Sequence, residues 1–570
     1  MADEAIHTAI QQRLLADASP FALDSLVLNG HRLAVYRHAP ETLLQVLDEA
    51  RGHGEAPFIK YLDSLWTFAD FTRGVDSLAA WLLAQGVVAG DRVAIAMRNR
   101  PEWAVAFMAA VRIGALPAPL NSFGQGDELR QALAYLEPAV LCCDRERLDR
   151  LAGQTGVPGC RLVVAGNDEG LPLGEAASFE SALSAWPEPR LPEVRVDPDS
   201  PALILFTSGA TSRPKGVVSS HRAVGQALFN IDFIGALSGM TSPEAVKRIE
   251  AQRRPSVTLT AVPLFHVSGL HAQLLTAMRH GRQLIFMHRW NAVDALALMR
   301  SEGVTQFNGA PSMVRQLVMA AEERDDDILE GLWGMGFGGS GVPDSLLDKV
   351  LSRFPEQMVG IGFGMTETNG AVSAVSGALF RGRPRSSGAL SPLFDVQILA
   401  PDGEALPAGE VGEVCVRGVT LMQGYWREPE ATARALEQGW LRTGDLGYLD
   451  AEGFLFIVDR LKDVIVRSGE NIAPAEIESC LTAHPAVAEA AVFGIPDEET
   501  GEAVAAMVAL REGEWVEESE LQAHVRHYLA GYKVPSAIRI RHDALLRNPA
   551  GKLLKKHLRE DFLQDTAQLQ

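Results

Sequence analysis

Residues 205–216 read Leu205-Phe206-Thr207-Ser208-Gly209-Ala210-Thr211-Ser212-Arg213-Pro214-Lys215-Gly216, and they say more about the fold than any other stretch of the chain. The apolar run that leads into them, Ala202 to Phe206, predicts a buried strand that ends in a loop of glycines and hydroxylated residues. Because glycine has no side chain, such a loop lets backbone N–H groups, hydroxyls and one lysine approach a polyanion. It differs from the common P-loop, in which Gly-Lys-Ser/Thr opens a helix, since Lys215 lies between Pro214 and Gly216. The segment predicts a phosphate-binding loop, and a flexible turn without function is the competing interpretation.

Strands and helices alternate on both sides of this loop. Before it, Val93–Met97 predicts a strand and Pro101–Arg112 a helix with proline at its first position. Beyond it, a similar pattern continues to about residue 390, interrupted by a charged helix from Ser242 to about Arg254 that we interpret as a surface insertion of unknown role. Further strands are expected at 139–143, 161–165, 256–261, 283–287 and 331–337. The pattern predicts an α/β fold with two α/β subdomains and parallel-rich sheets.

The pattern also divides the chain into three parts. Residues 1–50 are expected to form an N-terminal helical extension, and residues 51–459 a large N-terminal domain. From about 392 to 459 this domain changes to short strands separated by turns, which predicts a β-rich subdomain. Residues 460–570 are expected to form a small α+β C-terminal domain, with the boundary between Asp459 and Lys462.

Composition narrows the classes of function. Of 570 residues, 47% are hydrophobic and 22% charged, as in ordinary globular proteins. The formal net charge of −20 argues against nucleic acid or an anionic membrane surface as the main partner. A site for an anionic small ligand would therefore be built from metal, backbone dipoles and a few Lys or Arg side chains.

Targeting signals are not apparent. The five cysteines show no metal-ligand spacing, and we expect reduced interior thiols. The first residues are acidic where a signal peptide would be basic, and the most apolar stretch, Trp103–Leu120, is interrupted by Arg112 and Pro117. We expect a cytoplasmic protein without a transmembrane segment.

Several further segments resemble functional loops. Taken singly, each has an ordinary interpretation: an interior histidine, a surface carboxylate, a turn aspartate, a solvated lysine. Their order and spacing along the chain make that interpretation improbable for the whole set. The segments are Pro263–Gly269 with His266, Gly338–Gly341, Gly362–Thr368, Trp440–Asp445, Asp459–Asp463 and Arg547–Lys552.

Together these motifs resemble the ATP-dependent adenylate-forming (AMP-binding) superfamily, which includes acyl-CoA synthetases, adenylation domains of peptide synthetases and beetle luciferases. The resemblance covers roughly residues 60 to 555. It implies a large AMP-binding domain followed by a mobile lid domain. It also implies that a carboxylate attacks the α-phosphate of ATP and expels pyrophosphate, a step that depends on positioning and charge neutralisation.

The resemblance assigns the nucleotide contacts. Glu367 would ligate Mg²⁺, which prefers carboxylate and phosphate oxygens, and Thr366 would contact the α-phosphate. Asp445 would accept hydrogen bonds from the ribose hydroxyls, with Arg460 beside it. The β- and γ-phosphates would be held by Thr207, Ser208, Gly209, Thr211, Ser212 and Lys215, and the adenine slot would be lined by Gly338, Gly339, Ser340, Phe363 and Gly364.

It also assigns the groups that act in the two half-reactions. Lys552 would reach the acyl oxygen and the bridging phosphate oxygen as charge develops in the first step. The lid would then rotate about Lys462 and bring Gly469 to the site, where a small residue leaves room for a pantetheine arm. His266 would lie between the two chemistries and shape the acyl pocket.

Two residues depart from the family pattern. Ala210 stands where a threonine is usual and Ser212 where a glycine is usual. The lost hydroxyl removes a phosphate hydrogen bond of about 1.5–3 kcal/mol. Ser212 offers a replacement donor, so the departure bears on ATP affinity more than on activity.

The acyl pocket is expected to draw on four mostly apolar segments. They favour a medium- or long-chain fatty acid or an alicyclic acid as the substrate, with an aryl acid as the nearest alternative. Within these segments, Asp232 is the ionisable residue besides His266. The segments are 229–237, 266–270, 308–311 and 336–339.

The acceptor is expected to be CoA, because Ser468–Ile472 followed by Pro474 resembles the acyl-CoA synthetase branch. A free-standing enzyme that loads a separate carrier protein is the alternative. A non-catalytic nucleotide binder and a light-emitting oxygenase are less favoured by the residues present. The oligomeric state is not readable from the sequence, and a homodimer is left open.

Overall fold

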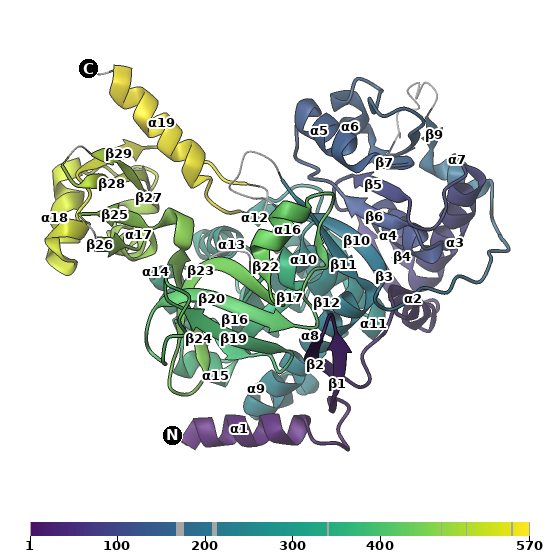
Figure 1. Cartoon of the computed structure of the whole chain (residues 1–570), viewed down its shortest axis with the longest axis horizontal. Helices are drawn as coiled ribbons and strands as arrows, with labels where there is room; N and C mark the ends of the chain where they lie inside the picture. Colours follow the sequence, from purple (N-terminus) through teal and green to yellow (C-terminus); the bar gives the residue numbers. More distant parts are fainter. Residues whose placement is uncertain are drawn as a thin grey trace.

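The computed structural model of the chain describes residues 2–166, 176–207, 214–338, 341–468, 470–497, 499–548 and 551–568. It has a mixed α/β architecture with parallel-rich sheets and a separate C-terminal domain, as the sequence predicts (Figure 1). Within the described ranges, every helix is too short or too polar to span a bilayer.

The first α/β subdomain is built on a parallel sheet with the strand order β6-β5-β7-β8-β9. Helices cover both faces, because Val93 and Ile95 of β5 pack in one core cluster while Ala94 and Ala96 pack in another. The strands are β5 (Arg92–Ala96), β6 (Leu116–Pro119), β7 (Val140–Asp144), β8 (Arg161–Ala165) and β9 (Ala177–Ser178), and the helices are α3 (Phe68–Ala84), α4 (Pro101–Arg112), α5 (Gly126–Leu136), α6 (Arg145–Arg150) and α7 (Phe179–Ser184).

The second subdomain contains the largest sheet, whose central strands run β16-β15-β14-β12-β13-β3 and pair in parallel. The strands are β3 (Pro57–Tyr61), β4 (Ser64–Thr67), β12 (Val257–Thr260), β13 (Gln283–Phe286), β14 (Gln306–Gly309), β15 (Gly334–Phe337), β16 (Met358–Met365) and β17 (Gly370–Ser376). The helices are α8 (His221–Thr241), α9 (Pro243–Gln252), α10 (Val267–Gly269), the π-helix η1 (Leu270–Leu275), α11 (Thr276–His280), α12 (Ala292–Ser301), α13 (Pro311–Glu323), η2 (Ile328–Gly331), α14 (Asp344–Arg353), η3 (Thr366–Thr368) and α15 (Ala378–Gly382).

A group of antiparallel strands continues this sheet. Strand β18 pairs with both β17 and β24, so the segment expected to be a β-rich subdomain is hydrogen-bonded to the main sheet. The strands are β18 (Gly388–Leu390), β19 (Phe394–Leu399), β20 (Gly412–Gly418), β22 (Leu436–Glu437), β23 (Trp440–Leu449) and β24 (Phe454–Arg460), with α16 (Pro429–Ala435). A small separate sheet joins β10 (Pro201–Phe206), β11 (Gly216–Ser220) and β21 (Gly424–Tyr425).

The expectation of a purely helical extension over residues 1–50 is corrected by the structure. Helices α1 (Ala2–Leu14) and α2 (Leu43–Arg51) flank an antiparallel hairpin of β1 (Leu23–Leu28) and β2 (His31–Tyr36). Its turn residues, Asn29 and Gly30, have φ values of 50° and 81°, the left-handed backbone that Asn-Gly turns adopt. The Asn-Gly pair was the sequence signal for this hairpin.

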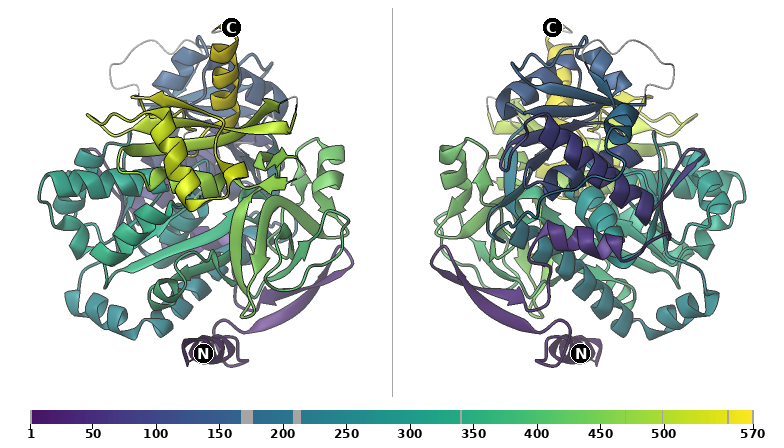
Figure 2. Two further views of the ribbon diagram at one scale, coloured as in Figure 1. Left: turned by 90° about the vertical axis from the view of Figure 1, so that its left-hand side faces the viewer. Right: turned by 90° about the vertical axis from the view of Figure 1, so that its right-hand side faces the viewer.

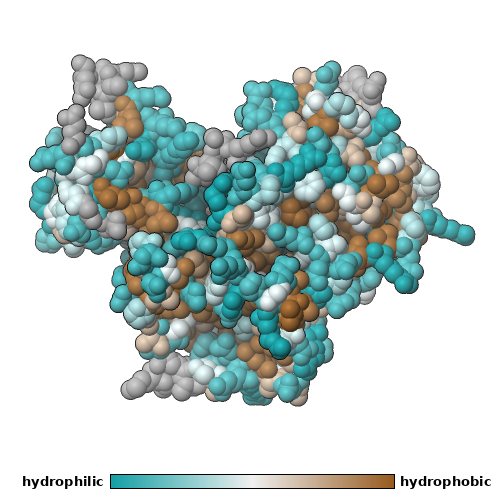
Figure 3. Space-filling view, viewed as in Figure 1, coloured by the Kyte–Doolittle hydropathy of each residue, from teal (hydrophilic) through white to brown (hydrophobic). Residues whose placement is uncertain are grey.

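The C-terminal domain lies at one end of the N-terminal body, at the left of Figure 1, and faces the viewer in the left view of Figure 2. Its central hairpin, β27 and β28, has α17 and α18 on one face and α19 on the other. In Figure 3 the surface is hollowed between this domain and the first α/β subdomain. The elements are η4 (Leu461–Asp463), β25 (Ile465–Arg467), β26 (Glu470–Ile472), α17 (Pro474–Thr482), β27 (Val487–Asp497), β28 (Gly501–Leu510), α18 (Glu518–Tyr528), η5 (Gly531–Lys533), β29 (Ala537–Arg541) and α19 (Lys555–Gln568).

Candidate active site

The two ends of the predicted phosphate loop are joined by the hairpin of β10 and β11. The backbone N–H of Thr207 donates to the carbonyl of Lys215 at 3.0 Å, which closes the base of the loop. The Lys215 ammonium lies 4.7 Å from the centre of the Tyr425 ring, a cation–π contact that holds the lysine at the edge of the sheet. The other predicted loop residues, Ser208, Gly209, Thr211 and Ser212, lie outside the described residues.

Glu367 lies beside this loop. It belongs to the short helix η3, and its backbone carbonyl accepts from Met422 N–H at 2.8 Å, which fixes the turn. Its Oε1 accepts a hydrogen bond of 3.0 Å from the Tyr425 hydroxyl. Burial raises the pKa of Tyr425, and the Glu367 carboxylate raises it further, so the phenol stays protonated and keeps donating. Lys215, Tyr425 and Glu367 therefore form one polar group, with Thr366 next to it in the chain.

This polar group fits a magnesium ion held mainly by a nucleotide. One oxygen of the half-buried Glu367 carboxylate is used by Tyr425, which leaves the other for a hard cation. Mg²⁺ is commonly bound by one or two carboxylates plus substrate phosphates, rather than by an all-protein cage. Consistent with that, the described part of the chain contains no group of three or more His, Cys, Asp or Glu side chains able to hold a metal.

Strand β16 brings Phe363 and Gly364 to the same region. Gly364 follows a register shift in the β16–β17 ladder, and a Cβ added there would overlap the Gly370 carbonyl oxygen. Only glycine fits this bulge. Of the predicted adenine-slot residues, Gly338 is described and has no atom within 4 Å of where a Cβ would be, whereas Gly339 and Ser340 lie outside the described residues.

Asp445 and Arg460 face each other across β23 and β24. They are register partners, and the Arg460 Nε lies 2.6 Å from Asp445 Oδ1. Burial raises the pKa of Asp445 to about 6, even though Arg460 and Lys552 favour its charged form and Glu367 opposes it. The second carboxylate oxygen, Oδ2, is buried and has no hydrogen-bond partner among the described residues. An orphaned acceptor at this position suits a ligand with hydroxyl donors.

Lys552, from the C-terminal domain, is close enough to this aspartate for the two charges to interact. Burial, and then Arg460, lower the pKa of Lys552 to about 8, while Asp445 opposes the shift. The Lys552 backbone N–H donates to Asn548 Oδ1 at 2.9 Å, which folds the tail motif into a tight turn. Lys462, the expected hinge residue, lies in η4 between the two domains, and burial lowers its pKa. The predicted Gly469 lies outside the described residues.

His266 ends the loop before α10 and is half-buried, with its Nε2 atom inside the protein. Burial lowers its pKa to about 4, so the imidazole is neutral at physiological pH. Its Nε2 has no hydrogen-bond partner among the described residues, and its ring lies 4.4 Å from that of Phe265. The following π-helix η1 reaches the Glu367 loop, because His271 Nδ1 lies 2.8 Å from the Asn369 carbonyl oxygen. His266 and its neighbour Phe265 thus form an uncharged wall just before η1, the helix that contacts the Glu367 loop.

The expected acyl-pocket segment 229–237 contributes mainly to the core. Phe229 and Phe233 of α8 are buried and pack on Phe21 from the N-terminal segment. Asp232 is committed to α11, since His280 Nε2 lies 2.7 Å from its Oδ1. These side chains are not free to line a ligand site.

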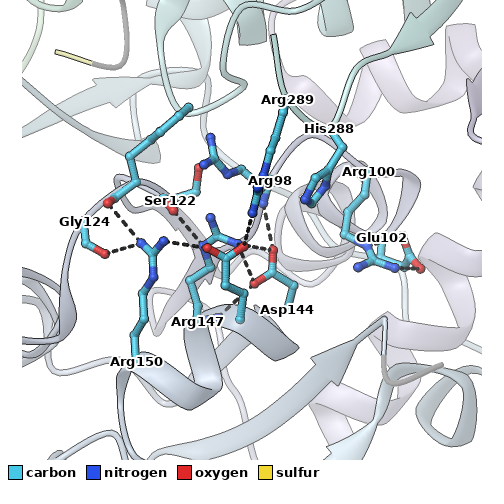
Figure 4. Close-up of polar contacts among 12 residues, drawn as sticks. Arg98, Arg100, Glu102, Ser122, Gly124, Asp144, Arg147, Arg150, His288 and Arg289 are labelled. Atoms are coloured by element: carbon cyan, nitrogen blue, oxygen red, sulfur yellow. Dashed lines mark hydrogen bonds and ion pairs between the residues drawn. The ribbon is translucent and has the colours of Figure 1, made fainter. Parts of the chain in front are cut away.

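Two features were missed by reasoning from the sequence. One is Tyr425, whose signal was the aromatic pair in Gly424-Tyr425-Trp426. The other is an arginine cluster at the carboxyl ends of β5, β7 and β13, formed by Arg98, Arg147, Arg150 and Arg289 with His288 (Figure 4). Its signal was a high density of arginines directly after apolar strands, at 98–100 and 145–150.

The arginine cluster is only partly neutralised. Arg147 is fully buried and pairs with Asp144 at 3.0 Å, and Arg150 pairs with Glu146 at 2.6 Å. Arg98 has its guanidinium carbon 3.4 Å from the Phe123 ring centre, and burial, followed by Arg147, lowers its pKa to about 10. Phe123 in turn lies 6.2 Å from Phe265, the neighbour of His266. A positive patch thus adjoins the His266 wall in a chain of strongly negative net charge.

Family models match most of the chain. Residues 46–426 match the AMP-binding enzyme model, and residues 476–552 match the model of the AMP-binding enzyme C-terminal domain. The chain belongs to the AMP-binding enzyme family.

Relatives place this AMP-binding enzyme in the acyl-CoA synthetase branch. It is 34% identical to a feruloyl-CoA synthase of Amycolatopsis sp over 513 residues, covering 90% of this chain and 97% of the relative. It is 32% identical to the long-chain-fatty-acid–CoA ligase FadD13 of Mycobacterium tuberculosis over 508 residues, covering 88% and 94%. The ATP-bound crystal structure of MatB from Rhodopseudomonas palustris matches with a TM-score of 0.78 and 26% identity, covering 91% of this chain and 98% of that one. This AMP-binding enzyme is therefore an adenylate-forming acid–thiol ligase.

Proposed function

We propose that this enzyme activates a hydrophobic carboxylic acid with ATP and transfers the acyl group to CoA. The observation that carries the proposal is that the lysine turn of the C-terminal domain lies against Ala310 and Ser312 of the N-terminal domain, where the charge of Lys552 interacts with those of Asp445 and Arg460. A cationic lysine next to a nucleotide-binding carboxylate is suited to a reaction in which negative charge develops between an acid and a phosphate.

In this proposal the residues of the N-terminal domain bind and orient ATP. Asp445 Oδ2 accepts hydrogen bonds from the ribose hydroxyls, and Lys215 with the loop after β10 holds the distal phosphates. Glu367, fixed by Tyr425, would hold Mg²⁺, which when bound supplies charge neutralisation to the phosphates. Lys552 donates from its ammonium to the oxygens that lie between the acid and the α-phosphate. The neutral His266 limits access of water to the acyl side without adding charge.

The acid is proposed to bind beside the Lys552 turn. An added Cβ on Gly551 would lie 2.8 Å from Ala310 Cβ, so the end of β14 borders the lysine. Gly338, just after the neighbouring strand β15, has no atom within 4 Å of where a Cβ would be, and this open space supports a bulky apolar acid such as a medium- or long-chain fatty acid or an alicyclic acid. The relative FadD13, a long-chain-fatty-acid–CoA ligase, supports the same choice.

An aryl acid is the second candidate, and one contact favours it. Asn308 is exposed at this point, and its Oδ1 occupies the place where a side chain on Gly336 would stand. A polar amide on the wall suits a ring with a polar substituent. The relatives named feruloyl-CoA synthase and 4-coumarate–CoA ligase, both 34% identical, point the same way.

The acceptor is proposed to be CoA rather than a carrier protein. The arginine cluster supports this choice, because CoA carries phosphates and the rest of the chain is strongly negative. We further propose that the chain works as an N-terminal domain of residues 51–459 and a lid of residues 460–570 that turns at Lys462 between the half-reactions.

Pyrophosphate release from ATP and Mg²⁺ tests the function. The assay is run with a panel of short, medium and long fatty acids, alicyclic acids and aryl acids, each with and without CoA. Turnover that requires both an acid and CoA supports the proposal and names the acid class. Acid-dependent exchange of pyrophosphate without turnover on CoA would indicate a carrier-protein acceptor. If none of the acids in the panel caused pyrophosphate release, the proposal would be contradicted.

A further inference from the structure

Helix α13 contacts the lysine turn of the C-terminal domain at its first residues. Gly551, with φ of 80°, lies against this helix end so closely that an added Cβ would be 2.8 Å from both Ala310 Cβ and Ser312 Oγ. Gly551 directly precedes Lys552. The N-terminal domain therefore touches the lysine turn at the residue next to the lysine.

One turn further along α13, Arg315 makes a second contact across the domains. Its Nη2 lies 3.5 Å from Oε1 of Glu489, a buried carboxylate on β27 of the C-terminal domain. The same carboxylate receives the backbone N–H of Leu545 at 2.9 Å and the Arg547 Nη2 at 3.1 Å. Glu489 thus joins α13 to the segment that leads into the lysine turn.

Arg547 carries the connection to the turn itself. Its Nη1 donates to the Gly551 carbonyl at 2.6 Å, and the turn is closed by Asn548, whose N–H donates to the Lys552 carbonyl at 2.8 Å. A continuous chain of polar contacts therefore runs from Arg315 through Glu489 and Arg547 to the peptide before Lys552. Removal of Arg315 would leave Glu489 with one cation fewer and would break the link of Glu489, and through it of Arg547, to α13.

We propose that Arg315 is a positioning residue for Lys552, holding the lysine turn in place for adenylate formation through Glu489 and Arg547. This inference rests on the proposed function, in which Lys552 acts in the first half-reaction. Arg315 belongs to the N-terminal domain, so the contact with Glu489 exists only in the arrangement of domains that this structure shows. Transfer to CoA, after the lid has turned, should not need it.

The interface offers a matched control. Ser479 of α17 donates to Asp344 Oδ2 of α14 at 3.2 Å, another hydrogen bond between the two domains. Among the described residues, the contacts of Ser479 do not lead to the lysine turn. A general loosening of the interface would be caused by Ser479→Ala as well, whereas a specific effect on Lys552 would be caused only by Arg315→Gln.

The test measures both half-reactions and the chemical exposure of Lys552. For Arg315→Gln, ATP–pyrophosphate exchange is expected to fall at least tenfold in kcat with KM for ATP within about twofold, while transfer from supplied acyl-adenylate to CoA stays unchanged. Labelling of Lys552 by acetic anhydride, read by peptide mass spectrometry, is expected to rise several-fold relative to Lys555. Arg315→Lys should recover part of both changes, and Ser479→Ala should show neither.

Each result then decides the inference. Exchange and labelling of Arg315→Gln equal to wild type would overturn it, and so would an equal loss of both half-reactions, which indicates a merely structural role. Should Arg315→Gln fail to fold, Arg315→Met, which removes the charge and keeps an unbranched side chain, is measured in the same way and gives the same decision. If the wild-type enzyme shows no acid-dependent exchange, the proposed function fails, and the labelling ratio alone still decides whether Arg315 positions Lys552.

Discussion

The two sides of the candidate site are built in different ways. On the N-terminal side, Asp445 and Arg460 are paired across a ladder of β23 and β24, and Glu367 is fixed by Tyr425 and by a backbone hydrogen bond. On the other side, Lys552 stands on a turn of the C-terminal domain that is held to the N-terminal body by a few polar contacts from α13. The proposed nucleotide side is thus preformed within one domain, while the position of the lysine depends on how the two domains meet.

This difference teaches how one site can serve two reactions. In the proposed function, residues inside the sheets would stay with the nucleotide throughout, whereas a group on a separate domain could be withdrawn without disturbing them. Substitutions on the two sides should therefore separate the half-reactions in different ways.

The largest expected effect comes from removing the lysine. Lys552→Ala should lower ATP–pyrophosphate exchange by about 10²–10³-fold, as loss of a charge-stabilising donor does, while supplied acyl-adenylate is still transferred to CoA. The measurement compares single-turnover rates of the two half-reactions. Lys556→Ala, an exposed lysine near the start of α19, is the control. A parallel fall of both half-reactions in Lys552→Ala would contradict the division between the two sides.

Substitution of Gly469 is expected to separate the two half-reactions in the opposite way. Gly469→Leu should leave ATP–pyrophosphate exchange near the wild-type value and reduce transfer to CoA by about 100-fold, because a branched side chain would fill the space proposed for the pantetheine arm. Gly469→Ala, a smaller change, should reduce transfer less. Normal CoA transfer in Gly469→Leu would remove the argument for a narrow passage at this residue.

Loss of the preformed carboxylate should affect both half-reactions. Asp445→Asn replaces the charged acceptor of the proposed ribose hydrogen bonds with a neutral one, at a cost of about 1.5–3 kcal/mol. The KM for ATP should therefore rise about 10–100-fold. Acyl-adenylate should also bind more weakly in the transfer step. Isothermal titration with ATP and the two kinetic assays measure this. Asp395→Asn, an exposed aspartate paired with Arg417, should change neither. If Asp445→Asn impaired ATP–pyrophosphate exchange alone, Asp445 would act only in adenylate formation, as is proposed for Lys552.

The local parts of this architecture could be predicted from the sequence. The expected helix 101–112 coincides with α4 and the expected strand 161–165 with β8, because apolar runs and a proline at a helix start are local signals. The fold class and the family followed from the order of Gly-rich loops. The hairpin at residues 23–36 was missed although Asn29-Gly30 announced it, because a short half-exposed strand pair has a weak apolar pattern.

The contacts that assemble the site could not be predicted in the same way. Arg98, Arg147 and Arg289 come from three strand ends that are far apart in the sequence, and only the folded sheets bring them together. The pairing of β18 with β17 and β24 likewise depends on long-range register. The commitment of Asp232 to His280 shows the converse, since an ionisable residue in an apolar segment turned out to be satisfied in the core rather than presented to a ligand.

The smallest expected effect is a difference in pH dependence between the two half-reactions. Burial lowers the pKa of Lys552 to about 8, so its ammonium is present below that pH and is lost above it. Burial raises the pKa of Asp445 to about 6, so its carboxylate is present above that pH and is lost below it. The kcat/KM of adenylate formation should therefore be bell-shaped, with limbs near pH 6 and pH 8, each approaching a tenfold change per pH unit.

Transfer to CoA should keep the acidic limb, since it also needs Asp445, and should lack the alkaline limb. Lys552→Arg, which stays charged, should move the alkaline limb of its remaining exchange activity upward. An alkaline limb near pH 8 that persists in Lys552→Arg, or that appears equally in transfer, would mean that another group titrates there, and the lysine would then not be the element that distinguishes the two sides.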